Sequence, residues 1–175
     1  MKNIRVLDCT LRDGGRIINC AFENQEIKEI SFRLADAKID IIEVGFLRDW
    51  RKVDYTGNST FFTDIDQIRP YVNKERKNTI YTAFIDFGMC DIDTLKPYDG
   101  TSVDAIRFGF TKKNYDEAKD EVIRWIYAIK NKGYKLFIQG VNSLNYSDRE
   151  LLEIVAMVNE VHPYSFGIVD TYGAM

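Results

Sequence analysis

Two residues that could do chemistry together, Arg12 and Asp13, stand side by side in the segment Asp8-Cys-Thr-Leu-Arg-Asp-Gly-Gly15. A third, Glu43, lies near the end of the next apolar run along the chain. An aspartate carboxylate can bind a hard divalent cation through oxygen. A neighbouring guanidinium can stabilise a developing enolate oxygen, and a second carboxylate can hold that guanidinium by a bidentate bond. These residue types are therefore suited to metal-assisted enolate chemistry.

Each feature also has a simpler explanation. Asp13-Gly-Gly15 can be a tight turn that needs positive φ, and Arg12 with Glu43 can be a structural ion pair. The chemical interpretation gains weight from the positions of these residues, because both segments end predicted strands.

Strands and helices alternate along the chain. The predicted strands are apolar runs rich in β-branched and aromatic residues, at 4–8, 39–46, 79–85, 103–109, 134–141 and 165–170. Apolar residues at helical spacing predict a helix from about Asn24, and shorter helices are expected at 64–72, interrupted by Pro70, and at 91–95. The strongest helix is predicted between an N-cap at Asn114 and a stop at Gly133. Ser147-Asp-Arg-Glu150 is a capping box that opens the last helix, and 47–62 is expected to be a long loop.

Helices between strands require parallel pairing with right-handed crossovers, which leaves two α/β architectures: an open doubly wound sheet or a (β/α)₈ TIM barrel. A barrel needs eight strands and typically ~250 residues, so this chain would supply about the first six βα units. Residues 1–175 are then one domain, the N-terminal part of an incomplete barrel. Either the chain is an excerpt of a longer protein, which the sequence favours, or a homo-oligomer or partner subunit covers the open strand edges.

In both architectures ligands bind at the carboxyl ends of the parallel strands. The polar residues at the later strand ends are Asp86, Arg107, Gln139, Asn142, Asp170 and Thr171. Asn142 and Thr171 are placed for substrate hydrogen bonds, with turn formation as the alternative. Arg16 could bind a substrate carboxylate or phosphate, with simple solvation as the alternative.

The motifs resemble a known group of enzymes. Asp8-Cys-Thr-Leu-Arg-Asp-Gly-Gly15, Ile41-Ile-Glu-Val-Gly-Phe46 and Ile168-Val-Asp-Thr-Tyr-Gly-Ala174 are similar to the 3-hydroxy-3-methylglutaryl-CoA lyase-like metallolyase superfamily. Its members include isopropylmalate and homocitrate synthases. The doubled glycine and the final motif look most like 4-hydroxy-2-oxovalerate aldolases, and the resemblance covers the whole chain.

The resemblance implies a TIM barrel in which Asp13 is a metal ligand, Arg12 the catalytic arginine on the enolate oxygen, and Glu43 its positioning partner. It also implies a divalent cofactor, Mn²⁺ or Mg²⁺ with Zn²⁺ or Co²⁺ as further options, and a small 2-oxo acid substrate.

Two positions depart from the superfamily pattern. Its other metal ligands form a His-x-His pair on the seventh strand, which this chain does not reach, and the single histidine, His162, precedes the sixth strand at the wrong end of a barrel. The 4-hydroxy-2-oxovalerate aldolases also place a catalytic histidine where Gly15-Arg16 stands here. That exact reaction is therefore not implied.

Composition excludes several classes of partner. The formal net charge is −3, from 24 basic and 27 acidic residues that are interspersed, which argues against nucleic acid. No apolar run approaches the roughly 20 residues of a membrane-spanning helix, so no membrane partner is expected. The first residues become polar too soon for a signal peptide, and three cysteines without metal-type spacing favour a cytoplasmic protein.

The sequence thus predicts a metal-dependent carbon–carbon lyase, an aldolase that acts next to a 2-oxo acid through an enolate. The first alternative is an acyl-CoA-condensing acyltransferase of the isopropylmalate synthase type. The second is a non-catalytic barrel scaffold that lacks a complete metal site.

Overall fold

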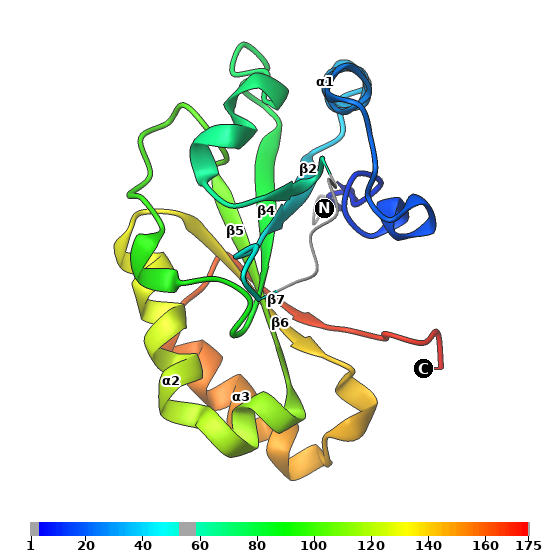
Figure 1. The fold of residues 1–175 in the computed structure, drawn as a ribbon. Coiled ribbons are helices and arrows are strands. Elements are labelled where there is room, and N and C mark those ends of the chain that lie inside the picture. Colours follow the sequence, from blue (N-terminus) through cyan, green and yellow to red (C-terminus); the bar gives the residue numbers. More distant parts are fainter. Residues whose placement is uncertain (1–3, 53–58, 175) are drawn as a thin grey trace.

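A computed structural model of the chain describes residues 4–52 and 59–174 (Figure 1). Six strands pair in parallel in the order β1-β2-β4-β5-β6-β7, and a short seventh strand, β3, pairs with β2 alone. The strands are β1 (Leu7–Asp8), β2 (Ile41–Leu47), β3 (Phe61–Phe62), β4 (Ile80–Asp86), β5 (Ala105–Thr111), β6 (Lys135–Val141) and β7 (Ser165–Ile168).

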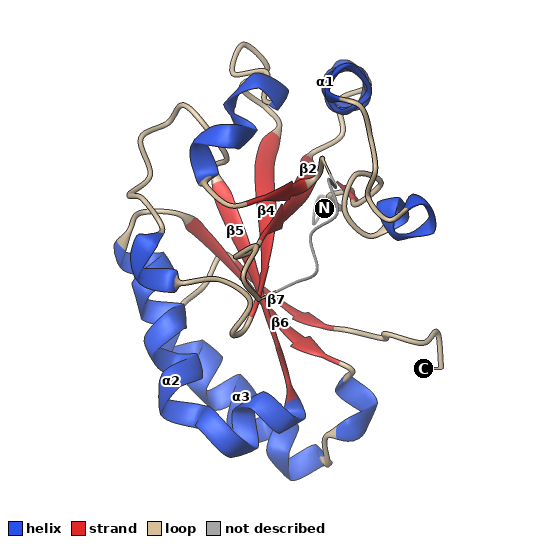
Figure 2. Cartoon of the chain, in the orientation of Figure 1, coloured by secondary structure: helices blue, strands red, loops and turns tan. Residues whose placement is uncertain are grey.

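The strand order decides between the two predicted architectures. A doubly wound sheet reverses its strand order at a switch point, whereas the six main strands here follow one another in chain order. Figure 2 shows them fanning into a strongly twisted, curved sheet with the helices outside. The fold is therefore a partial (β/α)₈ barrel with six of its strands, as predicted.

The two faces of the strands differ in character. Outward-facing residues such as Ile42, Ala83 and Phe108 join one large apolar core with the helices. That core forms because α1 (Asn24–Asp36) packs on β2, and α2 (Lys112–Asn131) packs on β5 and β6. The third helix, α3 (Asp148–Val161), adds its own buried apolar face to the same core.

The inward-facing residues are layered. The amino ends of the strands form a small apolar layer from Ile41, Ala105 and Phe137. One step further along β2, the inward position is taken by Glu43, which is completely buried. The barrel interior therefore changes from apolar to charged toward the carboxyl ends, where the predicted site lies.

Three expectations, about one strand, one loop and one helix, need correction. β1 spans only Leu7–Asp8, not 4–8. The Val6 carbonyl still accepts a hydrogen bond from the Ile41 N–H, but the register with β2 begins at Leu7, and the side chains of Ile4 and Val6 lie exposed. The loop predicted over 47–62 contains β3, whose Phe61 pairs with Phe46; residues 53–58 of that loop lie outside the described residues. The helix predicted at 64–72 is a 3₁₀ helix, Ile65–Tyr71, that includes Pro70.

The predicted start of the longest helix was also wrong. Thr111, not Asn114, is the N-cap of α2, and its side chain accepts a hydrogen bond from the Asn114 N–H. The Asn114 side chain in turn accepts a hydrogen bond from the Thr111 N–H and so completes a capping box.

Three further segments are 3₁₀ helices: Gly14–Ile18, Ile92–Thr94 and Ser143–Asn145. Ser147 and Glu150 form the predicted capping box of α3.

The two outer strands each pair on one side only within the described chain, β1 with β2 and β7 with β6. Near the amino ends the gap between them is spanned by Arg5, which donates a hydrogen bond to the hydroxyl of Tyr164. Across the described residues, every helix is too short or too polar to traverse a bilayer.

Candidate active site

The carboxyl ends of the strands surround a cavity of about 420 Å³. It is lined by Arg12, Asp13, Arg16, Phe84, Asp86, Arg107, Gln139, Val141, Val169, Asp170 and Thr171. The sequence had placed most of these polar residues at strand ends, and the fold brings them to one space. The three arginines and three aspartates of the lining cancel in formal charge.

Glu43 is the centre of the charged layer beneath this cavity. Its side chain is 0% exposed, and its two oxygens accept hydrogen bonds from different arginines. Arg12 Nε donates to Oε1, and Arg107 Nη1 donates to Oε2 at 2.5 Å. Burial disfavours the charge on Arg12, but Glu43 outweighs it, so the pKa of this guanidinium lies above its ordinary value. The predicted Arg12–Glu43 pair is present, and Arg107 makes it a triad.

The two arginines of this triad also contact an aromatic ring and a thiol. Arg12 Cζ lies 4.7 Å from the ring centre of Phe84, and Arg107 Cζ lies 5.6 Å from the same ring. The Sγ atom of Cys9 lies 3.4 Å from Arg107 Nη1 and 3.8 Å from Arg12 Nη2. Burial raises the pKa of the Cys9 thiol to about 11, with Glu43 adding to the rise. Cys9 is therefore a neutral thiol at neutral pH and a poor nucleophile.

Asp13 and Arg16 stand nearer the solvent. Asp13 Oδ1 accepts hydrogen bonds from Arg12 Nη1 at 2.9 Å and from Arg16 Nε at 3.1 Å. The side chains of Asp13 and Arg16 are 58% and 59% exposed. The turn that carries them is held because the backbone N–H groups of Arg12, Asp13 and Gly14 all donate to the Cys9 carbonyl. This turn presents one carboxylate and one guanidinium at the cavity mouth.

The opposite wall comes from the segments after β6 and β7. Thr171 lines the cavity, and its Oγ1 accepts a hydrogen bond from the backbone N–H of Asn142 at 2.9 Å. Asn142 itself adopts a left-handed conformation, with φ of 56°, and is not part of the cavity lining. Of the two residues predicted to bind substrate here, the structure therefore brings Thr171 to the cavity and places Asn142 behind it as a turn residue.

Three lining residues had been noted at strand ends without any role. Arg107 shares Glu43 with Arg12, and Gln139 exposes only 7% of its surface. Asp86 accepts a hydrogen bond at 2.6 Å from Arg48, whose guanidinium stacks on Phe46. The sequence did not show that these side chains point inward, because that depends on which alternate positions of each strand face the barrel interior.

The predicted metal ligand fits in part. Asp13 Oδ1 is held by two arginines, while among the described residues nothing bonds Oδ2, which can coordinate a hard cation. Nowhere in residues 4–52 and 59–174 do three or more His, Cys, Asp or Glu side chains gather closely enough to hold a metal. His162 caps the C-terminus of α3 in a left-handed conformation, as expected for a helix-end residue. The role of Asp13 as a metal ligand therefore stays a prediction.

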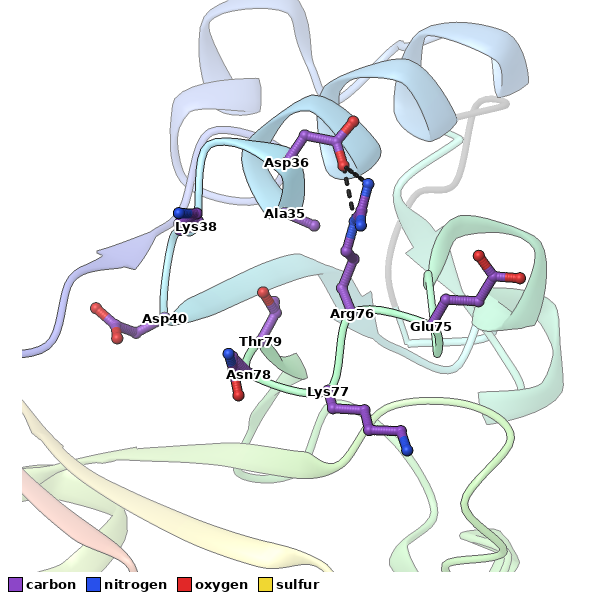
Figure 3. A pocket seen from close by; sticks show the side chains of 9 residues that line it. All are labelled: Ala35, Asp36, Lys38, Asp40, Glu75, Arg76, Lys77, Asn78 and Thr79. Carbon is purple, nitrogen blue, oxygen red and sulfur yellow. Dashed lines mark hydrogen bonds and ion pairs between the residues drawn. The ribbon is translucent and has the colours of Figure 1, made fainter.

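A larger hollow, about 850 Å³, lies at the amino ends of β2 and β4 (Figure 3). Arg76 and Asp36 form an ion pair at 2.6 Å across it, as Figure 3 shows. Its three acidic and three basic side chains balance, and Lys77 points away from the others. In barrels this face carries stability rather than chemistry, so the smaller cavity is the candidate site.

Comparisons with known proteins agree on one family. The model of the HMGL-like family matches residues 3–175. A probable 2-isopropylmalate synthase of Methanosarcina acetivorans is 25% identical over 178 residues, which cover 99% of this chain and 33% of that protein. The mitochondrial homocitrate synthase of Saccharomyces cerevisiae is 24% identical over 183 residues, 99% of this chain and 38% of the yeast protein. The chain thus spans about a third of the length of these relatives.

Among solved structures, the crystal structure of the N-terminal domain of a putative aldolase from Bacteroides vulgatus matches with a TM-score of 0.68. The two sequences are 22% identical, and the match covers 98% of this chain and 56% of the other. At this identity the likeness concerns the fold.

Proposed function

This chain belongs to the HMGL-like family, and we propose that it carries the enolate-stabilising half of a divalent-metal-dependent enzyme that makes or breaks a carbon–carbon bond next to a 2-oxo acid. The leading activity is that of an aldolase similar to 4-hydroxy-2-oxovalerate aldolase. A complete barrel of this kind has eight βα units; the described chain supplies six of its strands and, in this proposal, one of its metal ligands.

One observation carries the proposal: Arg12 is clamped by the buried Glu43 while lying beside the exposed carboxylate of Asp13. A guanidinium fixed in this way costs little reorganisation when negative charge develops next to it. Arg12 Nε and Nη1 are committed to Glu43 and Asp13, whereas Nη2 makes, within the described chain, only the long contact with Cys9. Nη2 is thus the donor available to a substrate oxygen.

The roles of the remaining residues follow from their positions. A divalent cation, when bound at Asp13, supplies Lewis-acid polarisation of the 2-oxo acid. Arg12 donates to the oxygen that becomes the enolate, and Glu43 with Arg107 keeps Arg12 in place. Arg16 binds an anionic substrate group at the mouth, and Thr171 donates a hydrogen bond from the opposite wall. Because the lining charges cancel, the added dication would provide the net positive charge that an enolate dianion requires.

Exchange of the methyl protons of pyruvate with D₂O tests this proposal whatever the second reactant is. The intact natural protein with Mn²⁺ should catalyse exchange, followed by NMR. Arg12→Ala should lower the exchange rate by at least about 10²-fold, the scale for loss of one preorganised oxyanion donor. Arg33→Ala is the matched control, because the Arg33 side chain is 82% exposed on α1. Exchange that persists in Arg12→Ala would refute the proposal.

A second candidate function is condensation of an acyl-CoA with a 2-oxo acid. It is favoured by the curated relatives, which are named 2-isopropylmalate and homocitrate synthases. The same Arg12 and Asp13 would serve it, with the enolate formed on the acyl group. Release of free CoA from acetyl-CoA that depends on added 2-oxo acid would select this activity over the aldolase.

A further inference from the structure

Gln139 is the most deeply buried uncharged polar side chain in the cavity lining. It projects from β6 on the inward face, between β5 and β7, and exposes 7% of its surface. Within the described chain, no backbone or side-chain group forms a hydrogen bond with its amide, although the amide borders the cavity. The amide atoms are open to the cavity rather than sealed from it, so they are available to a polar group there. The geometry therefore points to a group that enters the cavity.

The neighbouring strand shapes the place where this amide lies. Gln139 pairs in register with Gly167 of β7. A Cβ atom built on Gly167 would collide with Gln139 Oε1 and come 3.0 Å from its Nε2. The amide thus lies flat against the Gly167 backbone, in space that any other residue at 167 would fill. This arrangement positions the amide and limits its freedom to turn away from the cavity.

We propose that Gln139 is a specificity-determining residue that recognises a neutral oxygen, a carbonyl or a hydroxyl, on the part of the substrate beyond the 2-oxo acid group. The proposal rests on the proposed function, because it assumes that the 2-oxo acid group lies at Arg12 and Asp13. A carboxamide both donates and accepts, so it can serve either kind of oxygen. The carboxyl end of the substrate is already matched by Arg12 and Arg16, which follow β1, whereas Gln139 projects from β6.

Charge supports a neutral target. The charged side chains of the lining are three arginines and three aspartates, and among the described lining residues Gln139 and Thr171 are the only uncharged ones with hydrogen-bonding side chains. Anionic groups are therefore drawn to the arginines, while β6 and the segment after β7 offer the uncharged side chains of Gln139 and Thr171, next to the carboxylate of Asp170 that disfavours an anion there. A 2-oxo acid with a carbonyl or hydroxyl two carbons beyond its 2-oxo carbon fits this division.

A matched pair of ligands isolates the interaction. 2,4-Dioxopentanoate carries a C4 carbonyl that 2-oxopentanoate lacks, and neither compound undergoes retro-aldol cleavage. Because a β-diketone also chelates Mn²⁺ by itself, the contribution of Gln139 is measured as the change in the affinity ratio on its substitution. Dissociation constants are measured by calorimetry on the intact natural protein with Mn²⁺. The protein should bind 2,4-dioxopentanoate about tenfold more tightly, equivalent to ~1.4 kcal/mol.

Gln139→Met keeps the length of the side chain and removes its hydrogen-bonding groups, so it should bring the two dissociation constants to within about twofold. Gln25→Met is the control, because Gln25 is exposed on α1 and its side chain donates to Glu29; it should keep the tenfold preference. Thermal melting of both variants checks the fold. A wild-type protein without the preference, or a folded Gln139→Met variant that retains it, overturns the inference alone. Failure of 2-oxopentanoate and pyruvate to bind at all overturns the proposed function, and this inference with it.

Discussion

Arg107 of β5 reaches across β4 to donate a hydrogen bond at 2.5 Å to Glu43 of β2, a carboxylate with no solvent exposure. The two residues come from strands that do not pair with each other, so only the closing curve of the sheet brings them together. Arg12 binds the other oxygen of the same carboxylate. One buried negative charge is thus shared by two positive ones, and the orientation of Arg12 depends on both partners.

Replacing this carboxylate should destabilise the protein. Glu43→Gln leaves an amide N–H facing one guanidinium, removes the carboxylate that pairs with Arg107, and leaves Arg12 with Asp13 alone. Breaking a buried ion pair costs about 3–5 kcal/mol, so the free energy of unfolding in urea should fall by about that amount. Glu117→Gln is the control, because Glu117 is 66% exposed and lies 4.0 Å from Lys113. A loss below about 1 kcal/mol would mean that the triad is not structurally important.

Metal affinity should depend on Asp13. Asp13→Asn removes the charge from a carboxylate at the cavity mouth whose Oδ2 makes no hydrogen bond within the described chain. The dissociation constant of Mn²⁺ for the intact protein should rise by at least about tenfold, the scale seen when even an indirect partner of a metal is lost. Asp36→Asn, at the ion pair of the hollow near the amino ends of the strands, should leave this constant unchanged. Equal Mn²⁺ affinity in Asp13→Asn and the wild type would exclude Asp13 as a ligand.

The Cys9 thiol should respond to pH in a defined direction. Burial, with a contribution from Glu43, raises its pKa from 9.0 to about 11. Between these values the folded protein keeps a proton that the unfolded chain releases, so the thiol destabilises the native state increasingly as the pH rises from 9 to 11. Alkylation of Cys9 by iodoacetamide at pH 8, followed by mass spectrometry, should be slow in native protein and fast in urea. Rapid labelling of the native protein would contradict the buried, neutral thiol.

Gly167 should control ligand preference through Gln139. In Gly167→Ala the new methyl group would collide with Gln139 Oε1, so the amide has to move. The preference for 2,4-dioxopentanoate over 2-oxopentanoate should fall several-fold, while the melting temperature changes little because no hydrogen bond of the amide is lost. Gly140→Ala is the matched control on β6, since its Cβ would meet Phe166 at an ordinary 3.9 Å. Equal effects of the two substitutions would argue against a directed role for the amide.

The sequence predicted much of the scaffold and part of the site. Five of the six predicted strands lie within about two residues of the structure, because both faces of these strands are covered and their apolar runs are continuous. The first strand was overextended, since Ile4 and Val6 are apolar but exposed, and the pairing with β2 starts only at Leu7. The N-cap of α2 was misplaced by three residues, because Thr111 and Asn114 are both good capping residues and only geometry shows which one ends the extended strand.

Some of the predicted site residues lie together in the structure and others do not, because the sequence does not show how the loops turn. Arg12, Asp13 and Glu43 could be paired from the sequence because two are adjacent and the third ends the next strand. Asn142 and Thr171 follow strands in the same way, yet the chain turns so that Thr171 lines the cavity and Asn142 supports it.

The residue types and their period determined, by themselves, that strands alternate with helices and that a polar rim follows the strand ends. Tertiary structure alone decided that the strands run in chain order around a barrel, that Arg107 shares Glu43 with Arg12, and that Gln139 is left without a partner in the described chain. The physical reason is the range over which each effect acts. Local propensities act over a few residues, whereas these contacts depend on the curvature of the sheet and on which alternate side chains face inward.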